Sequence, residues 1–393
     1  MSDTQPLQHR IPVSKAVYSE ASKLKMNDVY TSGRLAAGPM VYEFESQWAN
    51  YLGLNPQKMV AMSSGTAALE AVMHYIGSSG DRPWCAIVSP LGFFSTVSAI
   101  VRAGGTPIFA DVDESGNLDP VHVKKILNTH TNITAVVVTH WLGQPAQVDA
   151  LKMLCDEDVF LVEDCAQAHG ALLDGKPVGT FGDFAIWSFY ATKHITTAGE
   201  GGAVYAKHQQ AHEFVRRYRS HGMSNADTHD FIGTNARLSE IGAACAIPQI
   251  GKLEKDIGER MRVASLYREH LQHVDHVKFH TPEPATRHAY FWMPLRIDRS
   301  LMTGKRFKNH LSQDGVEVRC RYSQPFYRQP ALFGAHLDGG TLPRAEDLAG
   351  QIIGLPYFAG ITIEQIDCVC VAVNSVVQDE LRARHAAREA VTT

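Results

Sequence analysis

A succession of short apolar runs in the middle of the chain constrains the fold most strongly. The runs are CAIVSP at 85–90, PIFADV at 107–112, AVVVTHW at 135–141, VFLVEDCA at 159–166, FAIWSFY at 184–190 and GAVYAK at 202–207. Most are apolar throughout instead of alternating, which is typical of strands buried on both faces. Segments that could be helical, such as 94–104 and 120–127, occupy several of the gaps. This alternation predicts an α/β fold with a mostly parallel mixed sheet flanked by helices.

The character of the sequence changes near residue 250. A long charged amphipathic segment at 252–274 precedes strand-like 288–297, helix-like 304–315, strand-like 316–322 and a last helix over about 362–379. We therefore predict a large α/β domain over residues 1–250 and a smaller α+β domain over 251–393. With 393 residues, of which 45% are hydrophobic, the chain is long enough for two cores. We expect the tail from 381 onward to be frayed or solvated.

The composition argues against several classes of protein. The chain has 37 Lys and Arg against 41 Asp and Glu, and no block of like charge, so we expect no nucleic-acid partner. No apolar run approaches the about 20 residues of a membrane span, and the polar first ten residues do not resemble a signal peptide. The seven cysteines form no CxxC pair. We therefore expect a reduced, cytoplasmic protein with no metal cluster, the isolated Cys368 and Cys370 included.

Three features indicate a binding site at one edge of the predicted sheet. Ligands of open α/β sheets lie past the carboxyl ends of the strands. Asp164 follows one apolar run and Lys193 follows another, and a helix that begins near Gly65 and Thr66 offers free backbone N–H groups to a phosphate. Alone, such an aspartate is commonly a cap and such a lysine is commonly solvated. In this order along one α/β chain, they predict a site for pyridoxal 5′-phosphate (PLP).

Several longer motifs make the resemblance specific. They include SSGTAAL at 63–69, VEDCAQAHGA at 162–171, GDFAIWSFYATKHITTAGEGGAV at 182–204 and GTNARLSEIGAA at 233–244. With these motifs the sequence resembles the DegT/DnrJ/EryC1/StrS family of PLP-dependent sugar aminotransferases, within the fold-type I superfamily. The resemblance extends from about Gly33 to about Asp367 and implies the fold-type I architecture.

The resemblance implies roles for individual residues. Lys193 takes the place of the lysine that forms the Schiff base with PLP, and Asp164 that of the residue paired with the pyridine nitrogen. Gln167 matches a glutamine near the ring and its 3-hydroxyl group. Gly65 and Thr66 match the turn that binds the phosphate.

Three further matches extend this set. Ser188 matches a serine whose hydroxyl reaches the phosphate, and Phe93 an aromatic residue stacked on the ring. There GFFSTVSAI stands in place of the commoner TFxATxxAI. Asn235 matches an asparagine that reaches the phosphate of the neighbouring subunit, which implies a homodimer with shared active sites. Here GTNARLSE departs from the usual GYNxRMxE, so a tyrosine is missing. Ser188 could equally be an ordinary strand-end serine, Phe93 a core aromatic and Asn235 a helix cap.

The implied reaction transfers an amino group in amino-sugar biosynthesis, for example of lipopolysaccharide or antibiotic sugars. The donor is an amino acid, by family habit glutamate, and the acceptor is a keto- or aldehydo-sugar, often nucleotide-linked. Two alternatives stay open: a PLP-dependent sugar dehydratase and a non-catalytic regulator. Relatives that dehydrate have histidine at the lysine position. Here that position is Lys193, and the histidine is the next residue, His194. We also expect His169 near the cofactor, and consider His140 and Trp141 as candidate pocket residues.

Overall fold

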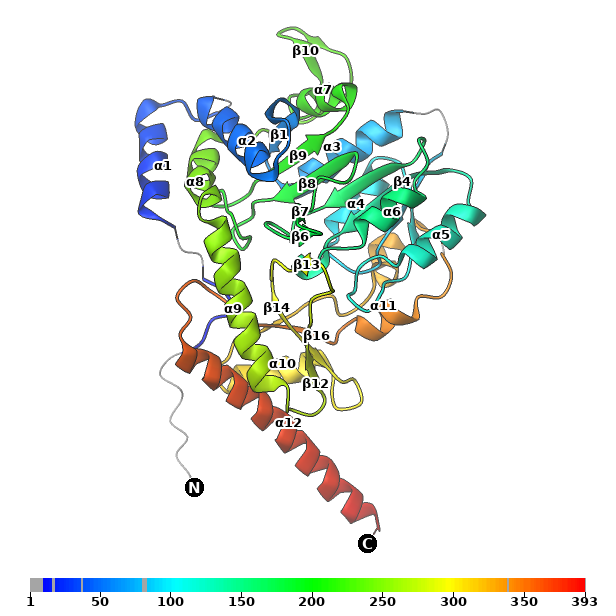
Figure 1. Cartoon of the computed structure of the whole chain (residues 1–393). Coiled ribbons are helices and arrows are strands. Elements are labelled where there is room, and N and C mark those ends of the chain that lie inside the picture. Colours follow the sequence, from blue (N-terminus) through cyan, green and yellow to red (C-terminus); the bar gives the residue numbers. More distant parts are fainter. Residues whose placement is uncertain (1–9, 16–17, 37, 80–82, 338, 393) are drawn as a thin grey trace.

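The computed structural model describes residues 10–15, 18–36, 38–79, 83–337 and 339–392 (Figure 1). Residues 1–9, on which the absence of a signal peptide was argued, lie outside the described residues. Within the described part, the main sheet has seven strands in the order β1-β9-β8-β5-β4-β2-β3. Their bounds are β1 Met59–Met62, β2 Cys85–Val88, β3 Thr106–Phe109, β4 Ile133–Thr139, β5 Phe160–Asp164, β8 Phe184–Ser188 and β9 Gly202–Ala206.

The pairing of these strands confirms the predicted α/β fold with a mostly parallel sheet. Strands β3, β2, β4, β5 and β8 pair in parallel, and β9 runs antiparallel to both β8 and β1. The six apolar runs each form one of these strands. The carboxyl ends of β1, β5 and β8 consequently lie at the same edge of the sheet, as a site at that edge requires.

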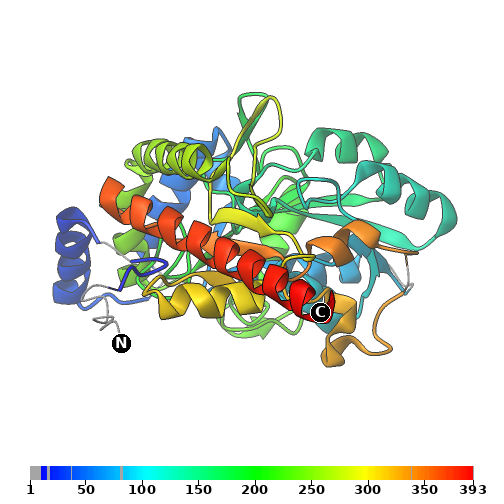
Figure 2. The ribbon, with the colours of Figure 1, turned by 90° about the horizontal axis from the view of Figure 1, so that it is seen from below.

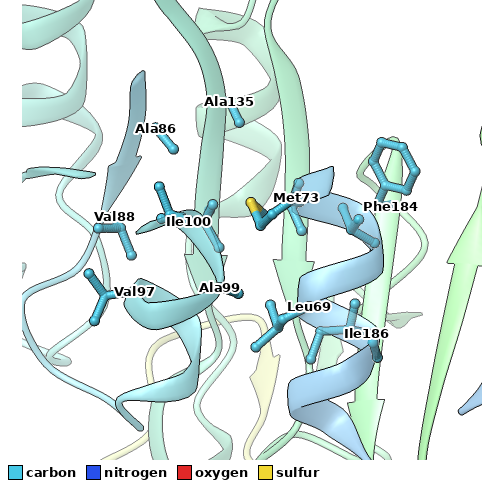
Figure 3. Close-up of a cluster of buried hydrophobic side chains, with 14 of the residues drawn as sticks. Leu69, Met73, Ala86, Val88, Val97, Ala99, Ile100, Ala135, Phe184 and Ile186 are labelled. Atoms are coloured by element: carbon cyan, nitrogen blue, oxygen red, sulfur yellow. The ribbon is translucent and has the colours of Figure 1, made fainter. Parts of the chain in front are cut away.

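Helices cover both faces of the main sheet. Residues from one face pack against α3 (Gly65–Ser78), α4 (Ser95–Arg102) and α7 (Gln209–Tyr218). Figure 3 shows Leu69 and Met73 of α3 beside Phe184 and Ile186 of β8. The other face packs against α2 (Pro39–Leu52), α5 (Pro120–Thr129), α6 (Val148–Leu154) and α8 (Glu240–Ile250). Because side chains alternate along a strand, Trp187 of β8 belongs to this second face.

The N-terminal helix α1 (Glu20–Ser32) packs against α8, and the hydroxyl of Ser22 donates a hydrogen bond of 3.0 Å to the carbonyl of Cys245. The carboxylate of Glu240, at the start of α8, accepts hydrogen bonds from the N–H groups of Gly38, Met40 and Val41. This carboxylate caps the first turn of α2, whose N–H groups have no partner within the helix.

A second sheet and core lie toward the C-terminus. The sheet has the order β12-β14-β16-β15 and is antiparallel, with β12 Val277–Phe279, β14 Met293–Ile297, β15 Arg319–Cys320 and β16 Ile352–Leu355. Helices α9 (Leu253–Leu271), α10 (Gly304–Gln313) and α12 (Ile363–Thr392) supply its core. Ile11 joins this core and bridges Val316. The division into domains at residue 250 stays a prediction.

Helix α9 runs from the main sheet to the second sheet (Figure 1), and α12 lies across the end of the molecule (Figure 2). The tail after 380 is helical instead of frayed, and side chains 382–390 are exposed. The remaining described elements are η1 Pro56–Lys58, η2 Trp141–Gly143, β6 Leu172–Leu173, β7 Lys176–Pro177, β10 Met223–Asn225, β11 Thr228–His229, β13 Thr286–Arg287, η3 Phe326–Arg328, η4 Pro330–Leu332 and α11 Pro343–Leu348. No helix among the described residues has the length and apolar character that a membrane crossing requires.

Candidate active site

A cavity of about 920 Å³ opens at the carboxyl edge of β1, β5 and β8. Its lining combines residues of the main sheet with residues of the C-terminal sheet. The predicted site residues that line it are Gly65, Thr66, Phe93, Asp164, Gln167, Ser188 and Lys193. Unpredicted lining residues include Phe291, Trp292, Lys308, Arg319, Arg321 and Tyr322. The structure therefore brings together seven of the eight predicted positions in one cavity, all except Asn235.

Asp164 is the last residue of β5, and its carboxylate is buried at the cavity wall. One carboxylate oxygen accepts a hydrogen bond of 2.8 Å from the hydroxyl of Thr96, and the other accepts one of 3.1 Å from the N–H of Ala166. Burial raises the pKa of Asp164, while these two hydrogen bonds and the nearby Lys193 oppose that rise. The cavity wall thus holds a buried carboxylate whose charged form is supported by two hydrogen bonds and by the nearby Lys193.

Lys193 lies in the loop that follows β8, and its side chain is partly accessible from the cavity. Its ammonium nitrogen lies 4.3 Å from the centroid of the Phe291 ring. The pKa of Lys193 is lowered to about 8, chiefly by burial; Asp164 opposes this shift and the positive charge of Arg319 adds to it. A substantial fraction of this side chain is therefore a neutral amine near pH 8, and a neutral amine is nucleophilic and basic.

The first turn of α3 lines the cavity with Ser64, Gly65 and Thr66. The hydroxyl of Ser64 caps the helix by accepting from the N–H of Ala67 at 3.1 Å. The N–H groups of Gly65 and Thr66 belong to the first turn, where helix geometry leaves them without intrahelical partners and the helix dipole favours an anion. A Cβ atom on Gly65 would lie 2.8 Å from the Cβ of Ser188, so only glycine fits this close approach.

Gln167 connects the two halves of the cavity wall. Its amide oxygen accepts from the N–H of Leu142 at 2.8 Å, and its amide nitrogen donates to the hydroxyl of Tyr322 at 3.1 Å. The ring of Tyr322 stacks on Trp292, with centroids 5.2 Å apart. Trp292 and Tyr322 therefore form an aromatic wall in the same cavity that Asp164 and Lys193 line.

The remaining predicted positions lie elsewhere. Asn235 is exposed, and its backbone bridges Ser220 instead of lining this cavity. His140 is buried behind the site, where its Nε2 lies 3.1 Å from the carboxylate of Glu163 and its Nδ1 accepts from the N–H of Ala146.

Trp141 and His169 also lie behind the cavity. The ring of Trp141 packs against Tyr322, with centroids 5.8 Å apart. His169 is buried against Trp48 and against His194, the neighbour of Lys193. Within the described part of the chain, neither His140 nor Trp141 is among the residues that line the cavity.

The sequence argument missed Thr96, Phe291, Arg319 and Tyr322. Thr96 had a usable signal, because it occupies the threonine of the TFxATxxAI pattern and sits at helical spacing from the following apolar residues. The other three come from the C-terminal sheet and its flanking segments. Nothing in their local sequence marks them, and their place at the cavity depends on how the two sheets pack.

Comparisons with known proteins agree with this geometry. A family model described as the DegT/DnrJ/EryC1/StrS aminotransferase family matches residues 18–374. The chain is 29% identical over 376 residues to the GDP-perosamine synthase of Escherichia coli O157:H7, covering 94% of this chain and 99% of that protein. It is 31% identical over 348 residues to a dTDP-3-amino-3,4,6-trideoxy-alpha-D-glucose transaminase of Streptomyces venezuelae, covering 87% and 89%. The solved structure of S. venezuelae DesV matches with a TM-score of 0.86 at 29% identity, covering 94% and 99%.

Proposed function

We infer, because the chain belongs to the DegT/DnrJ/EryC1/StrS aminotransferase family, that it is a PLP-dependent aminotransferase of amino-sugar biosynthesis. It takes an amino group from an amino acid, glutamate, and transfers it to a keto- or aldehydo-sugar that is linked to a nucleotide. One observation carries this proposal: Lys193, Asp164 and the first turn of α3 face the same cavity. The names of two relatives, a GDP-perosamine synthase and a dTDP-amino-sugar transaminase, support an acceptor that is a sugar linked to a nucleotide.

The residues present fit PLP. Gly65, Thr66 and Ser188 would hold its phosphate, since backbone donors and a hydroxyl converge where no Cβ atom fits. Asp164 would hold the proton of the ring nitrogen, because a buried carboxylate interacts strongly with a positively charged partner. When bound, PLP withdraws electrons from the bond to the substrate hydrogen that must be broken.

Lys193 supplies both attachment and proton transfer. Its lowered pKa makes the amine available near neutral pH. Once the donor amino acid has displaced it, the free amine of Lys193 would take the proton from the substrate carbon. It would then return that proton to the carbon on the other side of the transferred nitrogen. A positioned acid–base group of this kind contributes about 10²–10⁴-fold to a rate.

The cavity suits a large polar acceptor. Its about 920 Å³ falls in the range of sites for drug-sized ligands, and Phe93, Trp292 and Tyr322 offer flat aromatic surfaces. Lys308 and Arg321 add positive charge to the lining. A sugar ring against the aromatic wall with a diphosphate near these cations would use both features.

The enzyme works as a homodimer in this proposal, and Asn235 reaches the phosphate in the partner's site. The exposed position of Asn235, away from its own cavity, supports this arrangement. We place the reaction in the cytoplasm, because the seven cysteines have free thiols, as is usual in a reducing compartment.

The test is an amino-transfer assay on the purified protein loaded with PLP. L-Glutamate should convert the yellow cofactor form, with release of 2-oxoglutarate, and keto sugars with and without a nucleotide should restore it. Conversion of the sugar without release of 2-oxoglutarate would instead indicate the dehydratase. Failure of every amino acid to change the absorbance would reject the aminotransferase.

A further inference from the structure

His194, the residue after Lys193, has a hydrogen-bonding state that suits it to hold another segment of the chain. Its Nε2 lies 2.9 Å from the carbonyl oxygen of Ala289. A carbonyl only accepts hydrogen bonds, so Nε2 carries a proton and donates it. Burial and the nearby positive charge of Arg260 lower the pKa of His194 well below the ordinary 6.5, which keeps the ring neutral. A neutral imidazole has one N–H group, and here that group binds the backbone of a distant segment.

The segment that this histidine holds lies between β13 and β14 and is also attached to the loop after β4. The N–H of Ala289 donates to the carbonyl of Gly143 at 2.8 Å. The N–H of Phe291 donates to the carbonyl of Leu142 at 3.0 Å. Between them, Tyr290 has a φ of 48°, in the left-handed region that residues other than glycine rarely adopt. Because such a conformation persists only where surrounding contacts fix it, we infer that this backbone is held firmly from two loops of the main sheet.

Phe291 brings the held segment into contact with the reactive amine. Nζ of Lys193 lies 4.3 Å from the centroid of the Phe291 ring, and both residues line the larger cavity. The ring of His194 lies beside that of Phe291, with centroids 6.1 Å apart. A lysine side chain is long and flexible, so a ring face beside the amine reduces the number of directions in which the amine can point. Lys193 is thus connected to Phe291 twice, by the ring contact and by the hydrogen bond that its neighbour donates to Ala289.

We propose that His194 is a positioning residue, whose hydrogen bond to Ala289 keeps the ring of Phe291 against the amine of Lys193. The amine then points in one direction, both when it attaches PLP and when it moves the proton. Groups held in a productive geometry react faster, and a displacement of about 1 Å can cost about a hundredfold in rate. The proposal rests on the aminotransferase function inferred above and adds His194 and Phe291 to the residues on which the reactivity of Lys193 depends.

The first experiment starts from the cofactor-free protein and resolves the attachment of PLP into two stages. Stopped-flow absorbance over a range of PLP concentrations separates the affinity of the initial complex from the rate at which the amine then bonds to the aldehyde. His194→Leu removes the N–H donor, so the bond-forming rate should fall about tenfold to a hundredfold. The affinity of the initial complex should stay within about threefold of the wild type, because the phosphate site at α3 is unchanged.

Further variants distinguish positioning from a general loss of structure. His194→Gln keeps an N–H donor at similar reach and should restore the bond-forming rate to within about threefold of the wild type. Phe291→Leu removes the ring and should slow bond formation about as much as His194→Leu does. The double variant should be no slower than the slower single variant, because the two residues act through one contact. His130→Leu is the matched control, since its Nδ1 lies 3.3 Å from the carbonyl of Ile126 at the end of α5, and the rate should not change.

The second experiment follows the first half-reaction of the PLP-loaded proteins with L-glutamate through the cofactor absorbance. In His194→Leu the maximal rate should fall by a factor similar to that for bond formation. The glutamate concentration that gives half of this rate should stay within about threefold of the wild type, because the hydrogen bond orients the amine and does not bind substrate. An unchanged melting temperature shows that the variant is folded.

Several results would overturn the proposal. Equal bond-forming rates in the wild type and His194→Leu would show that the hydrogen bond does not position the amine. A double variant whose losses multiply would mean that His194 and Phe291 act independently, and His194→Gln as slow as His194→Leu would remove the role of the N–H donor. If His194→Leu does not fold, Phe291→Leu carries the test, and a wild-type rate there contradicts the proposal equally. A wild-type protein that does not attach PLP at Lys193 would reject the aminotransferase function itself, and the positioning role with it.

Discussion

The hydroxyl of Thr96 donates a hydrogen bond of 2.8 Å to the buried carboxylate of Asp164. The bond joins the first turn of α4 to the carboxyl end of β5, two elements far apart in the sequence. It favours the charged form of a carboxylate whose pKa burial raises. The proposed mechanism needs that charged form, because only a carboxylate can hold a proton on the ring nitrogen of PLP.

Removal of the charge on Asp164, or of the hydrogen bond that Thr96 donates to it, should therefore slow turnover. Asp164→Asn should lower kcat by about 10²-fold or more while the protein still folds. Thr96→Val should lower it by roughly tenfold, because one hydrogen bond to a charged group is lost. Ser98→Ala, on the same helix, serves as the control, because the hydroxyl of Ser98 donates to the carbonyl of its own helix residue Ser95. Steady-state kinetics would check this, and an Asp164→Asn rate close to wild type would remove the assigned role.

The contact between Gly65 and Ser188 predicts a steric effect on cofactor binding. In Gly65→Ala the new Cβ atom would lie 2.8 Å from the Cβ of Ser188. Relief of that overlap costs about 1–3 kcal/mol, so PLP should bind about tenfold to a hundredfold more weakly. Gly251→Ala meets no described atom within 4 Å and should bind PLP like the wild type. Fluorescence titration of the cofactor-free proteins measures both, and equal affinities would argue against a phosphate site at α3.

The lowered pKa of Lys193 predicts how cofactor uptake depends on pH. The neutral amine is the form that attacks the aldehyde of PLP, and its fraction rises as the pH passes the pKa. Uptake of PLP by the cofactor-free protein should therefore accelerate with pH. The midpoint should lie at about pH 8 instead of at the ordinary lysine pKa of 10.5. Arg319→Gln removes a nearby positive charge and should move the midpoint upward. Stopped-flow absorbance between pH 6 and 11 gives the midpoint, and a wild-type value near that of ordinary lysine contradicts the prediction.

The proposed role of Asn235 predicts complementation between subunits. An inactive Lys193 variant is mixed with an Asn235 variant that is itself shown to be inactive. If Asn235 acts in the partner's site, each mixed dimer has one site with both changes and one with neither. Part of the activity should then return after confirmed subunit exchange. No recovery would mean that Asn235 serves its own chain, and light scattering that finds a monomer would reject the shared site directly.

Much of the main sheet could be predicted because its strands are buried on both faces. Such strands are apolar along their whole length, and this property is local to the sequence. Strand β1 at Met59–Met62 was missed, since four residues with two methionines carry little strand preference. The antiparallel direction of β9 could not be predicted either, because a buried strand is apolar in both parallel and antiparallel pairing.

The candidate site likewise contains residues that local sequence predicts and residues that it does not. Residues at strand ends or helix starts, such as Asp164, Lys193 and Gly65, follow from local pattern and from the resemblance. Phe291, Arg319 and Tyr322 reach the cavity only because the C-terminal sheet packs over the carboxyl edge of the main sheet. That packing depends on contacts between distant segments, which periodicity does not encode.

Borohydride reduction of the PLP-loaded protein, followed by peptide mapping, tests the central claim most directly. Reduction converts the bond between a lysine and PLP into a stable amine that survives digestion. We predict that the pyridoxyl group lies on Lys193, that Lys193→Ala carries no label, and that this variant transfers no amino group. A label on another lysine, or none in a protein that still binds PLP, would contradict the assignment of the active site to this cavity.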